Sequence, residues 1–152
     1  VLDKFGAGPG DRALTQGAAG GDLLFVEACQ ARGVPVELLL PLAEPAFIER
    51  AGRPSADGEA WVERYYAAKA RLAGPPRVMP VELGPVDEAR ASPFERCNLW
   101  LLYTALACGP DKVRLVTLWD GGGADGPGGT RHMVEEVRRH TGRVSWIDAR
   151  TL

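Results

Sequence analysis

Two glycine-rich segments contain the residues best suited to chemistry in this chain. Residues 17–22 read GAAGGD, and residues 120–130 contain six glycines and end on Thr130. Glycine accepts a positive φ and lets a backbone approach a phosphate group closely. Each segment therefore predicts a cradle for a phosphate-bearing ligand. The predicted ligand-binding residues are Gly17, Ala18, Ala19, Gly20, Gly21 and Asp22 in the first segment, and Asp120, Gly126, Gly128, Gly129 and Thr130 in the second.

Each segment also has a purely structural interpretation. The first glycines can serve only to make a tight turn, because the spacing GxxGG alone is a weak signal. The second segment can be a disordered surface excursion without ligand. Ordering of that segment by a bound ligand would reconcile its two interpretations.

Several side chains near these segments could touch a ligand. Asp22 could bind ligand hydroxyls, although an acidic residue in a first helical turn is also favoured by the helix dipole. Asp120 follows a strand and is well placed to meet a ribose, while Trp119 could stack on a base or belong to the core. Asn98 could reach the ligand or satisfy a nearby backbone group. Residues 64–66 (Arg-Tyr-Tyr) could cover the pocket or only pack.

Catalytic side chains are harder to assign. Glu135 and Glu136 are catalytic candidates only if the chain is an enzyme, since a carboxylate there could act on a glycosidic bond but more often faces solvent. His132 and His140 lack metal-like spacing and are expected at the surface. No Ser-His-Asp or Cys-His arrangement can be argued from the spacing.

Alternating strands and helices must position these residues. Apolar periodicity and Gly, Pro and capping signals predict strands at 12–16, 34–40, 77–83, 113–119 and 143–147, and helices at 22–32, 47–50, 57–72, after Ser92 and after Thr130. The short spacing predicts an α/β fold, a Rossmann-like three-layer sandwich with a mostly parallel sheet. Ligands of such sheets bind at the carboxyl ends of the strands, where both glycine segments lie.

Composition narrows the class further. The length of 152 residues suits a single domain, 1–152, and the net charge of −2 argues against a nucleic-acid partner. Three cysteines without a CxxC pair predict neither disulfides nor a metal site, and we expect no cofactor. The cysteine usage fits a reducing cytoplasm, where we expect the protein. No apolar run is long enough for a membrane span, and the N-terminus lacks a basic-then-apolar signal pattern. The abrupt start at Val1 predicts a piece of a longer protein.

The first glycine segment and the residues after it resemble a known group. Residues 17–28 (GAAGGDLLFVEA), followed by Gly33 and residues 36–41 (VELLLP), are similar to the SLOG superfamily, with its LOG phosphoribohydrolases and Smf DNA-processing proteins. Residues 127–130 (PGGT) resemble the PGGxGTxxE motif of the LOG enzymes, in which the glycines and threonine hold phosphate and the glutamate serves the reaction. Glu135 is displaced from that spacing, so the resemblance implies phosphate binding more strongly than hydrolysis.

The sequence leaves three hypotheses. The first is a sensor domain, which binds a nucleotide or a nucleotide derivative (NAD-like, ADP-ribose-like or cyclic) and acts on a fused or associated effector domain. The resemblance to the SLOG superfamily implies that such a sensor would belong to a bacterial signalling or defence protein. The second is a nucleotide N-glycosidic hydrolase or transferase. The third is a ligand-free interaction scaffold, and a homo-oligomer is compatible with each.

Overall fold

The computed structural model describes residues 1–80, 92–122 and 129–151. The chain forms two compact units, Val1–Met79 and Pro80–Leu152, which we describe one at a time. The single domain expected from the length stays a prediction. Within the described residues, no helix combines the length and apolar character needed to cross a membrane.

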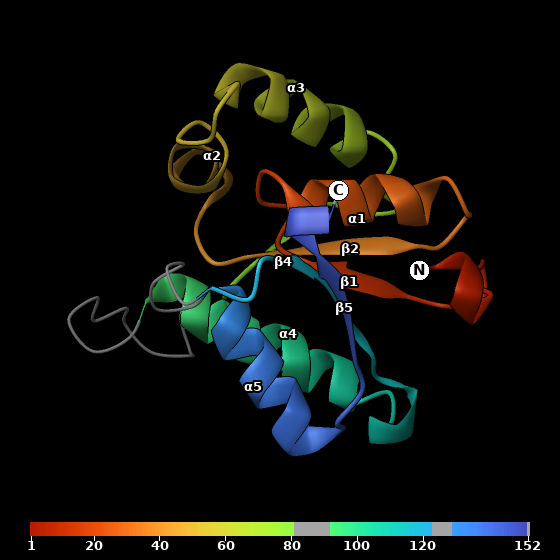
Figure 1. Ribbon diagram of the computed structural model, residues 1–152. Coiled ribbons are helices and arrows are strands. Elements are labelled where there is room, and N and C mark those ends of the chain that lie inside the picture. Colours follow the sequence, from red (N-terminus) through yellow and green to blue (C-terminus); the bar gives the residue numbers. More distant parts are fainter. Residues whose placement is uncertain (81–91, 123–128, 152) are drawn as a thin grey trace. The chain divides into compact units, whose positions relative to one another are not determined.

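The first unit is a three-stranded parallel sheet with helices between its strands. Its elements are β1 (Ala13–Thr15), α1 (Gly21–Gln30), β2 (Val36–Leu40), α2 (Glu44–Ala51), α3 (Gly58–Lys69) and β3 (Arg77–Val78), after a short 3-10 turn at Asp3–Phe5. The strand order is β1-β2-β3, with Ala13 opposite Val36 and Leu40 opposite Val78. In Figure 1, α1 lies along the sheet and α3 lies beside α1.

The core of this unit is built on β2. Leu38, Leu39 and Leu40 are each at most 1% exposed, so both faces of the strand are buried, as the continuous apolar run predicts. Phe47 of α2 and Tyr65 of α3 are buried with them, their ring centroids 6.0 Å apart. β2 therefore anchors the elements that carry the first glycine segment.

The second unit repeats the strand-helix-strand pattern. Its elements are α4 (Pro93–Leu106), a 3-10 turn (Pro110–Lys112), β4 (Leu115–Trp119), α5 (Thr130–His140), β5 (Val144–Asp148) and a final 3-10 turn (Ala149–Thr151). β4 and β5 are parallel, with Leu115 opposite Val144. α5 packs on α4 and on both strands (Figure 1). Parallel strands joined through helices in both units confirm the predicted α/β class.

The glycine and serine signals predicted the end of α1 and the start of α4 correctly. Gly33 has φ +70°, and its N–H donates to the carbonyl of Gln30, which closes α1 as predicted. Ser92 caps α4 by accepting a hydrogen bond from the backbone N–H of Phe94 at 3.2 Å.

Two predictions about element ends differ from the structure. The sequence predicts that the Asp57 side chain caps α3, but this side chain makes no capping hydrogen bond. Asp57 instead has φ +57°, so its backbone makes a left-handed turn into the helix. The expected strand at 77–83 is a strand only at Arg77–Val78, and residues 81–83 lie outside the described residues. Proline at position 80 cannot donate to a strand ladder.

Candidate functional site

The loop between β1 and α1 needs glycine at two positions. Gly17 has φ +82° and Gly20 has φ +89°, a region that residues with a Cβ rarely adopt. A Cβ on Gly17 would also lie 3.1 Å from Cδ2 of the buried Leu38. Packing and backbone conformation together therefore require glycine at position 17. At Gly20 a Cβ would meet no atom within 4 Å, so the space that a side chain at this position would enter is open.

Asp22 fastens this loop to the first turn of α1. Its Oδ2 accepts hydrogen bonds from the backbone N–H groups of Gly17 at 3.1 Å and Ala18 at 3.2 Å. The side chain of Thr15 and the backbone of Gln16 also bond to this carboxylate. Burial raises the pKa of Asp22, and these hydrogen bonds oppose that rise. The carboxylate thus serves its own loop, and it occupies two amides that a phosphate group could otherwise use.

Three further amides at the helix start remain available. The N–H of Ala19 donates to the carbonyl of Ala51 at 2.9 Å, which ties the loop to α2. The N–H groups of Gly20, Gly21 and Asp22 donate to no group in the described part of the chain. They stand at the positive end of the α1 dipole, where an anion is favoured. The loop can therefore accept one anionic group on these three amides.

The residues expected to cover the pocket have structural partners. Tyr65 is 1% exposed, and its hydroxyl donates to Glu44 Oε2 at 3.1 Å. Burial and the neighbouring Glu44 raise the pKa of Tyr65. Arg64 binds both oxygens of Glu27, at 2.8 and 2.6 Å, while Tyr66 is about half exposed. Tyr65 is thus a core residue, and Arg64 joins α3 to α1.

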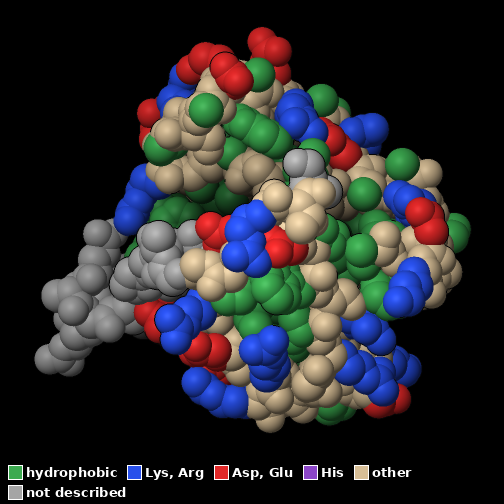
Figure 2. Space-filling model, viewed as in Figure 1, with side chains coloured by type: hydrophobic (Ala, Val, Ile, Leu, Met, Phe, Trp, Pro, Cys, Tyr) green, Lys and Arg blue, Asp and Glu red, His purple; other side chains and the backbone are tan. Residues whose placement is uncertain are grey.

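Lys69 completes a polar cluster beside Tyr65. Its ammonium donates to both oxygens of Glu44, at 2.8 and 2.7 Å. Figure 2 shows acidic and basic side chains interspersed over α2 and α3. The surface of these helices therefore carries mixed charge, not a basic patch.

The second glycine segment is described only at its two ends. Gly126 and Gly128 lie outside the described residues, whereas Gly129 precedes α5 and Thr130 is its first residue. Asp120 is exposed, and its Oδ1 accepts a hydrogen bond from the N–H of Gly122 at 2.7 Å. This carboxylate thus stabilises the start of its own loop.

Trp119 is engaged on both its ring and its backbone. Its indole N–H donates to the carbonyl of Gly122 at 3.0 Å, and its carbonyl accepts from the indole of Trp146 at 2.6 Å. The two indole centroids are 5.9 Å apart. The ring therefore packs against β5 and the following loop, which supports a structural role over base stacking.

The two candidate catalytic glutamates are each held by an arginine of the same helix. Glu135 is exposed, and Arg131 donates to it at 2.9 Å, which lowers the pKa of Glu135. Glu136 is buried and paired with Arg139. The lowered pKa of Glu135 is the opposite of the raised pKa that a general acid needs near neutral pH.

A histidine-glutamate pair joins the first turns of α4 and α5. His132 Nε2 lies 3.4 Å from Glu95 Oε1. His132 Nδ1 is buried and has no hydrogen-bond partner among the described residues. Sequence reasoning missed this pair because the two residues are far apart in the chain. The one sequence feature that pointed toward this pair was Glu95, an acidic residue in the first turn of α4.

His140 contacts its own helix and α4. His140 Nδ1 lies 2.9 Å from the carbonyl oxygen of Glu136, and its ring packs edge-on against Tyr103. Asn98 is 8% exposed within α4. No cluster of three metal-ligating side chains occurs among the described residues.

Comparison with known proteins does not assign the chain to a family. No family model, no curated protein and no solved structure matches this chain. The resemblance to the SLOG superfamily therefore stays a prediction.

Proposed function

We propose that the chain binds a nucleotide or nucleotide derivative through a phosphate group on the loop between β1 and α1. The observation that carries the proposal is the set of unbonded amides of Gly20, Gly21 and Asp22 at the start of α1. They follow a parallel strand, at the edge of the sheet where α/β proteins bind their ligands. The open space at Gly20 leaves room for a phosphate group to approach.

We further propose that the ligand is sensed and not cleaved. The pairing of Glu135 with Arg131 and of Glu136 with Arg139 favours this choice, because a catalytic carboxylate must be free to exchange a proton. In this proposal the domain belongs to a bacterial signalling or defence protein and reports to a fused or associated effector domain. The contribution of Gly126, Gly128, Gly129 and Thr130 to the phosphate site stays a prediction.

A thermal-shift screen with the purified chain tests the proposal. Inorganic phosphate, mononucleotides, cyclic nucleotides, NAD and ADP-ribose are added, and each mixture is analysed by chromatography afterwards. A ligand at about 100 times its Kd stabilises the folded state by about 2.7 kcal/mol, which raises Tm measurably. Intact recovery of a stabilising nucleotide supports the sensor. Release of free base would favour the hydrolase, and no shift with any compound would favour the scaffold.

Gly21 offers a matched pair of variants. Gly21→Glu places a carboxylate at the first position of α1, where the helix dipole favours negative charge, so the fold should be retained. The same charge should repel a phosphate group and abolish the ligand-induced shift. Gly21→Gln adds a similar side chain without the charge and controls for its bulk. Equal ligand shifts in the wild type and both variants would contradict a phosphate site at this loop.

A further inference from the structure

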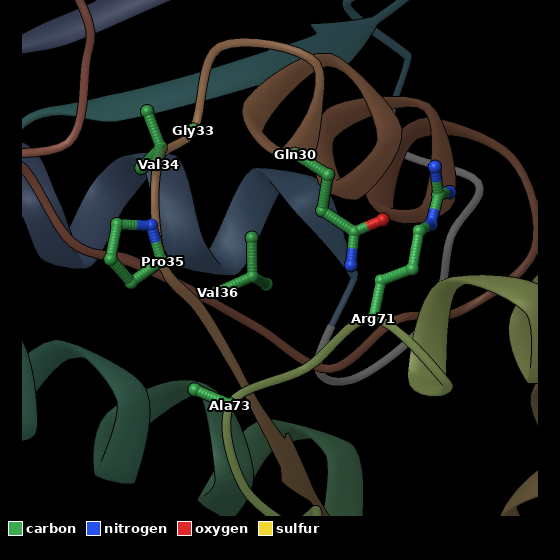
Figure 3. A pocket seen from close by; sticks show the side chains of 7 residues that line it. All are labelled: Gln30, Gly33, Val34, Pro35, Val36, Arg71 and Ala73. Atoms are coloured by element: carbon green, nitrogen blue, oxygen red, sulfur yellow. The ribbon is translucent and has the colours of Figure 1, made fainter.

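The pocket at the end of α1 does not bring open polar and apolar groups together. Its volume is about 270 Å³. Figure 3 places Arg71 beyond Gln30, on the side away from Val34. Val34 and Val36 are only 5% and 6% exposed, and Gln30 Oε1 is closed to solvent. A more accessible set of side chains lies in the second unit, where β4 and β5 end.

Trp146 presents an aromatic ring to solvent at this end of the second sheet. It is 49% exposed, although it is the middle residue of β5. Its indole N–H donates to the carbonyl of Trp119 at 2.6 Å, so the polar atom of the ring already has its partner. A Cβ on Gly121, which has φ +82°, would lie 3.4 Å from Trp146 Cζ2. The backbone at Trp119 and Gly121 thus holds the ring in place while about half of the residue stays open.

Asp120 supplies a negative charge beside this ring. It stands in the chain between Trp119 and Gly121, the two residues that contact the indole. The Asp120 side chain is exposed, and its Oδ1 accepts a hydrogen bond from the N–H of Gly122 at 2.7 Å. Its Oδ2 has no hydrogen-bond partner within the described residues. One carboxylate oxygen of Asp120 therefore stays free to accept a hydrogen bond from a cation.

The carboxylates at the ends of β4 and β5 outnumber the basic groups that answer them. Asp148, the register partner of Trp119, is bonded to Arg150 at 2.9 and 2.6 Å. The charge of Asp120 also acts on Arg150, so two carboxylates share one arginine. Among the described residues, no basic side chain lies over the Trp146 ring. The ring and Asp120 are therefore complementary to a cation that the described part of the chain does not provide.

The first unit contains the same combination of groups with its cation in place. The guanidinium of Arg64 lies over the Trp61 ring, 4.3 Å from its centroid, and donates to both oxygens of Glu27. A flat guanidinium can stack on an indole and still reach a carboxylate through its planar donors. The compact ammonium of lysine does not combine these two contacts in the same way. An indole beside a carboxylate therefore favours arginine over lysine.

We propose that Trp146 and Asp120 bind an arginine side chain of a partner protein. The guanidinium stacks on the open face of the indole and donates to the Asp120 carboxylate. A cation over an exposed ring and an exposed ion pair are each weak contacts, so this arginine is one contact of a larger interface. The site lies in the second unit and does not rest on the phosphate site proposed for the first.

Titration of the full chain followed by ¹⁵N NMR tests the proposal. The probe is a capped tripeptide with arginine at its centre, and matched tripeptides carry lysine or citrulline, which has a similar shape without the charge. We expect the arginine tripeptide at millimolar concentration to shift the Trp146 indole N–H signal, and the citrulline tripeptide to bind at least about fivefold more weakly. The Trp61 signal should not move, because Arg64 already covers that ring. Absence of a shift at Trp146, or equal affinity for citrulline or lysine, would overturn the proposal.

Three variants identify the residues involved. Asp120→Asn should weaken binding about two- to fivefold, because it removes an exposed ion pair while its oxygen can still accept from Gly122. Asp111→Asn removes the same charge before the start of β4 and should leave the affinity unchanged. Trp146→Leu identifies the indole signal by its disappearance, and it should abolish the arginine-induced shift of the Gly121 amide. Full affinity in Asp120→Asn, or a persistent shift in Trp146→Leu, would place the arginine elsewhere and overturn the proposal.

Discussion

The carboxylate of Asp22 accepts hydrogen bonds from the backbone N–H groups of Gly17 and Ala18, five and four residues earlier in the chain. The first turn of α1 therefore holds its own loop. We expect Asp22→Ala to lower the free energy of unfolding by about 2 kcal/mol, because hydrogen bonds to a charged group contribute about 1.5–3 kcal/mol. Urea denaturation monitored by circular dichroism measures this change.

Asp22→Asn is the matched control for this prediction. The amide keeps one acceptor oxygen for the loop, so its effect should be smaller than that of alanine. Unfolding of Asp22→Ala at the same urea concentration as the wild type would show that the loop does not depend on the carboxylate.

Gly17 and Gly10 should respond oppositely to alanine. Gly17→Ala puts a Cβ 3.1 Å from Leu38 Cδ2 in a backbone with φ +82°, so a loss of about 1–3 kcal/mol is expected. At Gly10 the φ is ordinary and no atom lies within 4 Å of the new Cβ, so Gly10→Ala should be neutral or stabilising by up to about 1 kcal/mol. Thermal unfolding compares the two variants. Similar Tm values for both would contradict the assigned strain at Gly17.

The sequence predicted the elements better than the roles of their side chains. The stop at Gly33, the cap at Ser92 and the buried strand before Pro41 depend on neighbouring residues, which a sequence displays directly. The inward turn of Asp22 depends on the path of the loop, and no local pattern specifies that path.

Contacts between residues far apart in the sequence could not be predicted either, because they too depend on the path of the chain. The bond from Gln30 to Ala68 and the pair of Glu27 with Arg64 exist only because α1 and α3 lie side by side. Periodicity identifies the apolar face of each helix but not its neighbour. The contact between His132 and Glu95 therefore appears only in the structure.

The pair of Glu27 and Arg64 should make stability depend on pH. Arg64 lowers the pKa of Glu27 below 4.5, the ordinary value of a glutamate. Because the folded state favours the ionised carboxylate, the stabilisation is complete above that ordinary value and is lost as the pH falls through the lowered pKa. Both side chains are about one-third exposed, so we expect a coupling energy of only about 0.5–1 kcal/mol at neutral pH.

A double-mutant cycle with Glu27→Gln and Arg64→Met isolates this coupling. The cycle is measured by urea denaturation at pH 7 and again at about pH 3, below the ordinary carboxyl pKa. The coupling should be smaller at the lower pH, because its stabilisation is lost progressively as the pH falls from the ordinary value toward the lowered pKa of Glu27. A coupling of equal size at both pH values would mean that packing of Arg64 over the Trp61 ring, 4.3 Å from its centroid, accounts for the contact instead.

The three cysteines should differ sharply in reactivity. Cys29 is 2% exposed, and burial raises the pKa of its thiol to about 11, so the reactive thiolate is scarce at neutral pH. Cys97 is fully buried in α4, whereas Cys108 is exposed after the end of that helix. Iodoacetamide at pH 7.5 should therefore modify Cys108 first and leave the other two unmodified while the protein is folded. Peptide mass spectrometry after a timed reaction identifies the labelled residue, and Cys108→Ser should remove the fast phase. Rapid labelling of Cys29 in that variant would mean that α1 opens far more readily than its packing against β1, β2 and α3 implies.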